Sequence, residues 1–334
     1  MTRILISLLI VLSAAGSAMA LEPLPKEKGW SGFVLLGGGF MKVEANTIAG
    51  NQIIDIGDET IDDIFASPDS DSSAVPTATF GLDYTFKNLK TQLFIGNDIE
   101  DYLRLDLVMA IGVRQKIGQS LLEAAIVRTP GVGREVWEDP YIAGSPRKET
   151  DWDATGIRLT WQTGGLEFLI SAREIEVDNE RSGLDGGLGL TPGEIALLDR
   201  EGNINRFRTR YRFKPRGRHI FEPGIEFIDH DSDGEAKAYD GARLLFTYAF
   251  HGLPKWLWTT TVQAGSFEHK EVNPIYGIQD EFDSVAINST FTWDLFKSDR
   301  WKAIVIAAYA DRDHDIDFYD SQIVSGSVGA IYRF

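Results

Sequence analysis

Four arginines at every second position form the clearest chemical pattern in this chain. Arg206, Arg208, Arg210 and Arg212 alternate with Phe207, Thr209, Tyr211 and Phe213. Because successive side chains of a β-strand point to opposite faces, this spacing predicts a strand with one cationic and one largely apolar face. A row of guanidinium groups either attracts anions or pairs with carboxylates.

Carboxylates at matching positions favour the pairing. Pro215-Arg216-Gly217 predicts a tight turn, and the strand after it carries Glu222 and Glu226 on its even-numbered face. In either register that such a turn allows, two of the arginines lie directly across from these glutamates. Glu167, on the preceding predicted strand, points to the same side. We therefore expect a salt-bridge ladder, and the alternative is a cationic stripe that guides small anions.

One acidic segment has the spacing of a calcium loop. It runs Asp229-His230-Asp231-Ser232-Asp233-Gly234, with Asp240 in the twelfth place. However, Asp replaces the usual terminal Glu, Lys237 occupies the ninth place, and the flanking segments are predicted strands. We expect an acidic hairpin loop here, and we predict neither a metal nor a cofactor.

Two histidines lie among aspartates, as in hydrolases that activate a water molecule. They are His230 and His314, and both fall where predicted strands meet loops. The chain has no G-x-S-x-G, H-E-x-x-H or P-loop pattern. A hydrolase active at the rim of the fold is therefore a minor alternative, and we predict that the protein is not an enzyme.

Composition narrows the class of protein. The 334 residues carry 33 basic and 50 acidic side chains, a net charge of −17, which argues against a nucleic-acid partner. The absence of cysteine excludes disulfides and thiolate chemistry. Residues 1–20 resemble a secretory signal peptide, with Arg3, an apolar stretch and the cleavage sequence Ala18-Met19-Ala20. The predicted mature domain is residues 21–334.

Segments with apolar side chains at every second position recur along the mature chain, as expected of strands in a transmembrane barrel. In 103–113 the polar face carries Arg104 and Asp106, and in 157–161 it carries Arg158. There are fourteen such segments, with twelve as the alternative count: 31–42, 78–86, 90–97, 103–113, 121–128, 157–161, 166–173, 206–213, 219–229, 242–250, 256–267, 285–293, 301–311 and 324–334. We predict an all-β, antiparallel, up-and-down transmembrane barrel.

The connections between these segments alternate in length. Six short turn sequences lie near residues 88, 119, 164, 216, 253 and 298, whereas 45–76, 130–151, 178–203 and 268–281 are long. Bacterial outer-membrane barrels have short periplasmic turns and long extracellular loops. Aromatic residues flank the short turns, as in a membrane-interface girdle. In the third long loop, Thr191-Pro192-Gly193-Glu194 predicts the start of a short helix.

The end of the chain resembles the last strand of Gram-negative outer-membrane proteins. It reads Val328-Gly329-Ala330-Ile331-Tyr332-Arg333-Phe334, with a terminal Phe and apolar residues at every second position before it. The resemblance implies that Tyr332 and Phe334 belong to a signal read by the barrel-assembly machinery. It also implies export through the periplasm and a location in the cell outer membrane.

The mature start resembles an uncharacterised proteobacterial outer-membrane family, a domain of unknown function. The resemblance rests on Gly29-Trp30-Ser31-Gly32-Phe33, on Gly37-Gly38-Gly39-Phe40 and on Gly50-Asn51. Such a family implies no reaction, ligand or catalytic residue.

A barrel sets the direction of the arginine row. Each arginine facing lipid at mid-membrane would cost about 2–4 kcal/mol, so Arg206, Arg208, Arg210 and Arg212 must face the lumen. Acidic side chains concentrate in 45–76 and 311–320. Beside phosphorylated lipopolysaccharide, such a rim needs divalent cations as bridges, but a simply solvated face is the more ordinary interpretation.

We expect the barrel to allow passive passage of small solutes, as a porin does, because fourteen strands enclose more space than the roughly eight that side chains can fill. The alternative is a structural or surface-binding barrel with a plugged lumen. The predicted partners are outer-membrane lipid, lipopolysaccharide, the barrel-assembly machinery and small solutes.

Overall fold

The structure is a computed structural model that describes residues 24, 27–51, 54–97, 109–129, 134–215, 217–251, 256–296 and 300–334. The predicted signal peptide, residues 1–20, lies outside this part, and so do Arg104 and Asp106.

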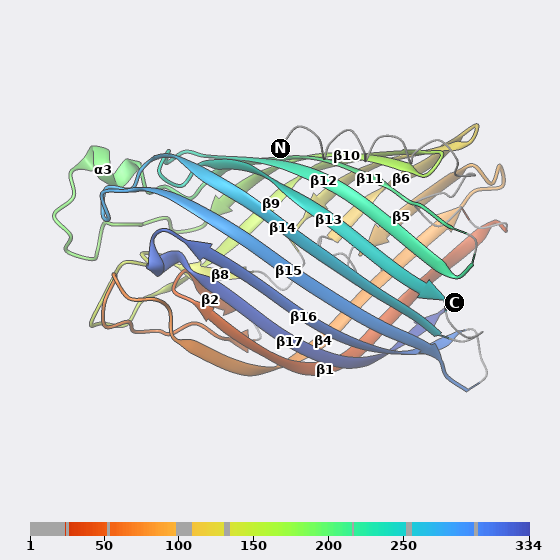
Figure 1. The fold of residues 1–334 in the computed structure, drawn as a ribbon, viewed down its shortest axis with the longest axis horizontal. Helices are drawn as coiled ribbons and strands as arrows, with labels where there is room; N and C mark the ends of the chain where they lie inside the picture. Colours follow the sequence, from red (N-terminus) through yellow and green to blue (C-terminus); the bar gives the residue numbers. More distant parts are fainter. Residues whose placement is uncertain are drawn as a thin grey trace.

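Fourteen antiparallel strands of the described part form a closed barrel (Figure 1). Each pairs with the next barrel strand along the chain, and the last pairs with the first from Phe33↔Arg333 to Ala45↔Ser321. In order they are β1 (Gly29–Ala45), β4 (Ser70–Thr85), β5 (Thr91–Gly96), β6 (Met109–Ile117), β7 (Ser120–Arg128), β9 (Glu149–Thr163), β10 (Leu166–Val177), β11 (Gly202–Tyr211), β12 (His219–Ser232), β13 (Tyr239–His251), β14 (Trp256–Val272), β15 (Gln279–Asp294), β16 (Trp301–His314) and β17 (Ser321–Arg333). The predicted barrel of fourteen strands is confirmed.

The two ends of the barrel differ. Short turns join the strands at the end where the chain terminates, and the longer loops gather at the other end, beside the label α3 in Figure 1. These loops contain three short strands, β2 (Ile48–Asn51), β3 (Ile54–Asp55) and β8 (Arg134–Trp137), and a 3-10 turn, η2 (Asp317–Tyr319). We refer to the two ends as the turn end and the loop end.

The predicted helix is confirmed as α3 (Pro192–Ala196), and its start has a capping box. The Thr191 hydroxyl accepts a hydrogen bond from the Glu194 amide, and the Glu194 carboxylate accepts one from the Thr191 amide. No helix in the described ranges has the length and apolar character needed to cross a membrane.

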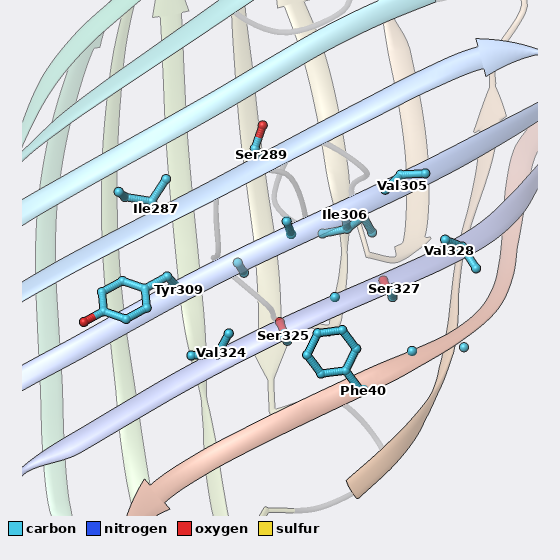
Figure 2. A pocket seen from close by; sticks show the side chains of 15 residues that line it. Phe40, Ile287, Ser289, Val305, Ile306, Tyr309, Val324, Ser325, Ser327 and Val328 are labelled. Carbon is cyan, nitrogen blue, oxygen red and sulfur yellow. The ribbon is translucent and has the colours of Figure 1, made fainter. Parts of the chain in front are cut away.

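Apolar side chains cover the outer face of the barrel. Along β17 the outward positions include Val328, which is 62% exposed, while the inward Ile331 is buried. Figure 2 shows outward side chains of β1, β15, β16 and β17, among them Phe40, Tyr309 and Val328, around a shallow apolar groove. A large exposed apolar surface of this kind is suited to lipid.

Aromatic rings form contacts near the turn end. Tyr84 and Phe86 have ring centroids 5.2 Å apart, Trp301 and Tyr332 4.8 Å, and Phe250 and Trp256 5.4 Å. These residues belong to the aromatic set expected beside the short turns, and rings in this position are suited to a membrane interface.

The seam between β1 and β17 depends on glycine. An added Cβ on Gly39 would overlap the backbone carbonyl of Gly326 on β17, and one on Gly37 would overlap that of Val328. Gly38, between them, faces outward, and the nearest atom to an added Cβ is the Val75 carbonyl oxygen at 3.7 Å. The inward glycines therefore allow the closing strands to approach closely.

This contrast gives a matched test of barrel closure. Gly39→Val should destabilise the folded barrel by about 1–3 kcal/mol or prevent its closure, because the side chain overlaps the backbone of β17. Gly38→Val should have little effect, since its side chain points into lipid. Heat-modifiability gels and thermal melting measure both, and equal stability of the two variants would contradict the role assigned to the seam.

Candidate functional site

The lumen is where the predicted charged residues meet. Register places Arg208 opposite Glu226 on β12, and Arg210 opposite Glu167 on β10. The guanidinium of Arg208 lies 3.8 Å from both Glu167 and Glu226, so it bridges two neighbouring strands. Just beyond β11, Arg212 pairs closely with Glu222. Arg206 occupies the next inward position toward the loop end.

The pairing continues around the wall in both directions. Glu226 accepts a hydrogen bond from the Arg243 Nε at 2.6 Å. On the other side, Glu167 accepts one from the Gln162 amide at 2.9 Å, and Arg158 lies two inward positions from Gln162 on the same strand, β9. The inward side chains of β9 to β13 are thus linked almost without interruption.

A second group of charges extends this wall to β4. Glu123 accepts hydrogen bonds from Arg158 at 3.0 Å and from Arg114 at 2.8 Å. Arg114 also donates to Asp83 at 3.1 Å, and its guanidinium lies 4.0 Å from the centre of the Phe94 ring. We define the lumen belt as five arginines and five carboxylates: Asp83, Arg114, Glu123, Arg158, Glu167, Arg208, Arg212, Glu222, Glu226 and Arg243.

Sequence reasoning missed four belt members, Asp83, Arg114, Glu123 and Arg243. The missing signal was available in the alternation, because Arg114 and Glu123 flank the turn at Gly118 and pair directly across it. Arg243 lies directly opposite Glu226 on the neighbouring strand, so its side chain faces the lumen as well.

Most of the belt is shielded from water. Seven of its ten residues are only 1–8% exposed, including Glu226 at 1% and Arg208 at 4%. Ionic groups buried to this extent are tolerated when they are paired and hydrogen-bonded. The long belt side chains therefore pack against one another on the inner wall of the barrel.

The wall opposite β10 and β11 carries uncharged side chains, some small and some apolar. In the circular order of the fourteen strands, β10 lies opposite β17 and β11 lies opposite β1. The inward positions there include Gly37 and Gly39 on β1 and Ser327 and Gly329 on β17, which pair across the seam. The lumen is thus asymmetric, with long charged side chains on one side and uncharged ones on the other, where small residues stand beside the buried apolar cluster of Leu35, Ile304, Ile306 and Ile331.

The loops form a small hydrophobic core of their own at the loop end. We call this unit the loop cap, and its buried members come from four connections: Ile61, Ile64, Tyr141, Leu198, Ile316 and Phe318. Hydroxyl groups reinforce it, with Tyr141 and Tyr319 oxygens 2.6 Å apart and Asn273 donating to Tyr319 at 2.8 Å. The loops are therefore a folded layer in contact with one another.

A buried carboxylate organises two of these loops. Asp139, fully buried, accepts hydrogen bonds from the backbone amides of Tyr141, Gly183, Asp185 and Gly186 at 2.8–3.2 Å. These amides belong to the loops that precede β9 and β11. Because four donors satisfy one carboxylate, the two loops are held in a fixed arrangement.

The two histidines considered for catalysis have different surroundings. The His314 Nδ1 lies 2.7 Å from a carboxylate oxygen of Asp280, beside which His269 also lies at 3.4 Å. His230 instead stacks its ring edge against Tyr239, with centroids 4.8 Å apart. Asp280 was not among the residues predicted from the sequence. Its carboxylate also accepts a hydrogen bond from the Ile316 amide, so it joins the top of β15 to the loop cap.

The segment with calcium-like spacing is a hairpin connection between β12 and β13. Asp229 and Asp231 both lie on the outer face and accept hydrogen bonds from Lys270 at 3.0 and 3.1 Å. No group of three or more acidic or histidine side chains in the described ranges has a geometry that suits a metal ion.

Lys237 is half-buried in this same connection, under the loop cap. Its ammonium nitrogen lies 3.6 Å from the centre of the Tyr319 ring. Burial lowers the pKa of Lys237 to about 7, against the attraction of Asp280. The folded cap therefore releases this proton at a lower pH than the unfolded cap does.

This difference predicts a pH-dependent stability of the loop cap. Between about pH 7 and 10 the unfolded cap binds the extra proton, so raising the pH should stabilise the folded cap by at most about 1.4 kcal/mol per pH unit. Below pH 7 Lys237 is protonated in both the folded and the unfolded cap, so it no longer makes the stability of the cap depend on pH. Limited proteolysis of the loops at pH 7.5 and 9.5 measures the effect. Lys237→Met should remove it, and an unchanged pH dependence in that variant would contradict the assignment.

Comparisons with known proteins place the chain as follows. Three solved structures resemble it, and the similarity covers 92% of this chain in each case. A loop L8 deletion mutant of OmpT, an outer membrane protein of Vibrio cholerae, has a TM-score of 0.42, 10% identity and 100% of its own chain covered, and the CymD monoaromatic hydrocarbon channel has a TM-score of 0.45, 11% identity and 89% covered. An anion-selective porin from Comamonas acidovorans has a TM-score of 0.40, 8% identity and 100% of its chain covered. No curated protein matches the sequence. A family model described as "Protein of unknown function (DUF2860)" matches residues 29–333, from the first barrel strand to the last. The chain therefore belongs to the DUF2860 family, in agreement with the resemblance seen in its glycine-rich start.

Proposed function

We propose that the protein is an outer-membrane channel through which small hydrophilic solutes pass passively, with the lumen belt as its constriction. The observation that carries the proposal is a charged, hydrogen-bonded inner wall within a fourteen-stranded barrel whose outer face is apolar. Polar and charged groups along an inner wall can replace part of the hydration shell of a solute that passes. The proposal includes no enzymatic step.

The asymmetry of the lumen sets the size of the solute. Belt side chains such as Arg208 and Glu226 are almost fully buried, so a solute must pass between them and the uncharged side chains of β1 and β17. Passage is therefore restricted to small molecules and ions, and the unit conductance is expected to be low.

A second candidate is a structural barrel whose lumen stays closed. The low exposure of the belt and the hydrophobic core of the loop cap favour it. In that case the belt braces the wall and the loops present a fixed surface to the outside.

The proposal includes a cellular setting. We propose that the chain is exported, cleaved after Ala20 and inserted by the barrel-assembly machinery, which reads Tyr332 and Phe334. The outer face then contacts membrane lipid and lipopolysaccharide. In support, the Phe334 ring is outward and half exposed, and it lies 6.2 Å from the ring of Tyr332.

Deleting Phe334 tests the assembly step. The amide and carbonyl of Phe334 each form a 3.1 Å hydrogen bond with Gly32, but the register from Phe33↔Arg333 onward survives without them. We expect the truncated chain to be exported normally and to insert poorly, because a recognition residue has been lost. Phe334→Tyr is the control and should insert well. Wild-type insertion of the truncated chain in heat-modifiability gels would contradict the assignment.

Single-channel recording in planar bilayers tests the channel. The wild-type protein should give small, reproducible steps, and Arg208→Ser combined with Arg210→Ser should give larger ones, because two long side chains leave the constriction. Glu226 keeps Arg243 and Glu167 keeps Gln162 as partners. Glu167 then keeps only a neutral partner, so the double variant should lose about 3–5 kcal/mol of stability.

The matched control is Arg128→Ser. Arg128 lies on the outer face of β7, where its exposed side chain pairs with Asp153. This control should leave the step size unchanged. If correctly folded wild-type and belt-opened proteins both remain silent, the channel is rejected in favour of the closed structural barrel.

A further inference from the structure

The barrel separates the charged side chains of this protein into those that face the lumen and those that face outward. The whole chain has a net charge of −17. The lumen belt, however, contains five arginines and five carboxylates and is therefore balanced. Any excess charge that a solute meets inside the barrel must come from inward positions other than the belt.

Those positions carry mainly arginine. Arg206 and Arg210 alternate with belt residues on β11, Arg173 lies inward on β10, and Arg312 lies inward on β16. Three of these, Arg173, Arg206 and Arg312, lie between the belt and the loop cap, and we call them the upper arginines. Several already have polar or ionic partners, but each still adds one positive charge to the wall.

Among the residues that the structure describes, few carboxylates share the inward face with them. Asp280 is inward and buried, and it is occupied by His314 and by the Ile316 amide. Asp71 stands at the outermost end of β4. Acidic side chains at the same height on the neighbouring strands, such as Asp229 and Asp231, point outward and bind Lys270.

The mouth of the lumen adds another cation. Arg134, on β8, lies opposite Trp152 of β9, and its guanidinium is 5.0 Å from the centre of that ring. Burial, and next the positive charge of Arg312, lower the pKa of Arg134 to about 10. Arg312 belongs to a strand on another side of the barrel and is itself exposed.

We propose that the channel prefers small anions and that the upper arginines, with Arg134, form the segment that selects them. This inference rests on the proposed channel function and names its substrate class. A surplus of fixed positive charge inside walls of low dielectric concentrates anions and repels cations. The belt below is itself balanced and limits the size of the solute, and Arg210 adds one further positive charge at its level.

The reversal potential across a potassium chloride gradient tests this inference. Wild-type protein should prefer chloride over potassium. Arg312→Gln should lower the chloride-to-potassium permeability ratio by about twofold to fourfold, because a unit charge within about 10 Å in water changes the local concentration of each ion about twofold, in opposite directions. Arg312 is exposed, so this variant should fold normally.

Two further variants sharpen the result. Glu226→Gln removes a lumen carboxylate and should raise the chloride preference. Lys270→Gln is the matched control, since it removes one positive charge at the same end of the barrel but on the outer face, and it should leave the ratio unchanged.

The outcomes separate the two proposals. Absence of conductance in every folded variant rejects the channel and the anion preference together. Conductance with equal permeabilities or a potassium preference leaves the channel standing and overturns the anion preference. An unchanged ratio in Arg312→Gln beside a lowered ratio in Lys270→Gln also overturns it, because selection would then come from the outer rim.

Discussion

Closure of the backbone hydrogen-bond ladder is the constraint on which the rest of this structure depends. In hydrocarbon, an unpaired amide or carbonyl has no water to replace its partner, so a spanning sheet must have no free edge. Here β1 and β17 meet that requirement over thirteen paired positions. Glycines at the inward positions of the seam let the two backbones approach, so small side chains line that side of the lumen.

Closure also decides where charge can lie. Once the outer face is committed to lipid, the period of two sends every second side chain inward, and long charged residues there must find partners within the wall. The lumen belt is the result. Each of its buried carboxylates contacts an arginine of the same or a neighbouring strand, and Glu123, Glu167 and Glu226 bring several strands into one network. Bracing and constriction are therefore two consequences of the same packing.

The loop cap is held together by the same kinds of contact as the core of a globular protein. Its members come from connections far apart in the sequence, and they share a hydrophobic cluster, a buried carboxylate that collects four amides, and a network of tyrosine hydroxyls. Asp280 links this layer to the tops of β15 and β16. The mouth of the lumen is thus shaped by the loops, while the belt shapes its middle.

Sequence alone determined the class of fold, the number of strands and the direction of the arginine row, because these follow from local rules: the alternation of side chains, the lengths of turns and the cost of a charge in lipid. It also located α3, whose capping residues lie within four positions of one another. Those rules act between neighbours in the chain. They do not reach the contacts between strands and loops that are distant in sequence.

The tertiary structure decided those contacts. Arg114 and Arg243 joined the belt only through the register of their strands, and Asp139 and Lys237 acquired their roles only when separate loops packed together. The sorting of charge, with carboxylates of the rim outward and the upper arginines inward, likewise depends on which face each strand presents after the barrel closes. The physical reason is that burial and electrostatic partners are set by proximity in space, which a period along one strand does not specify.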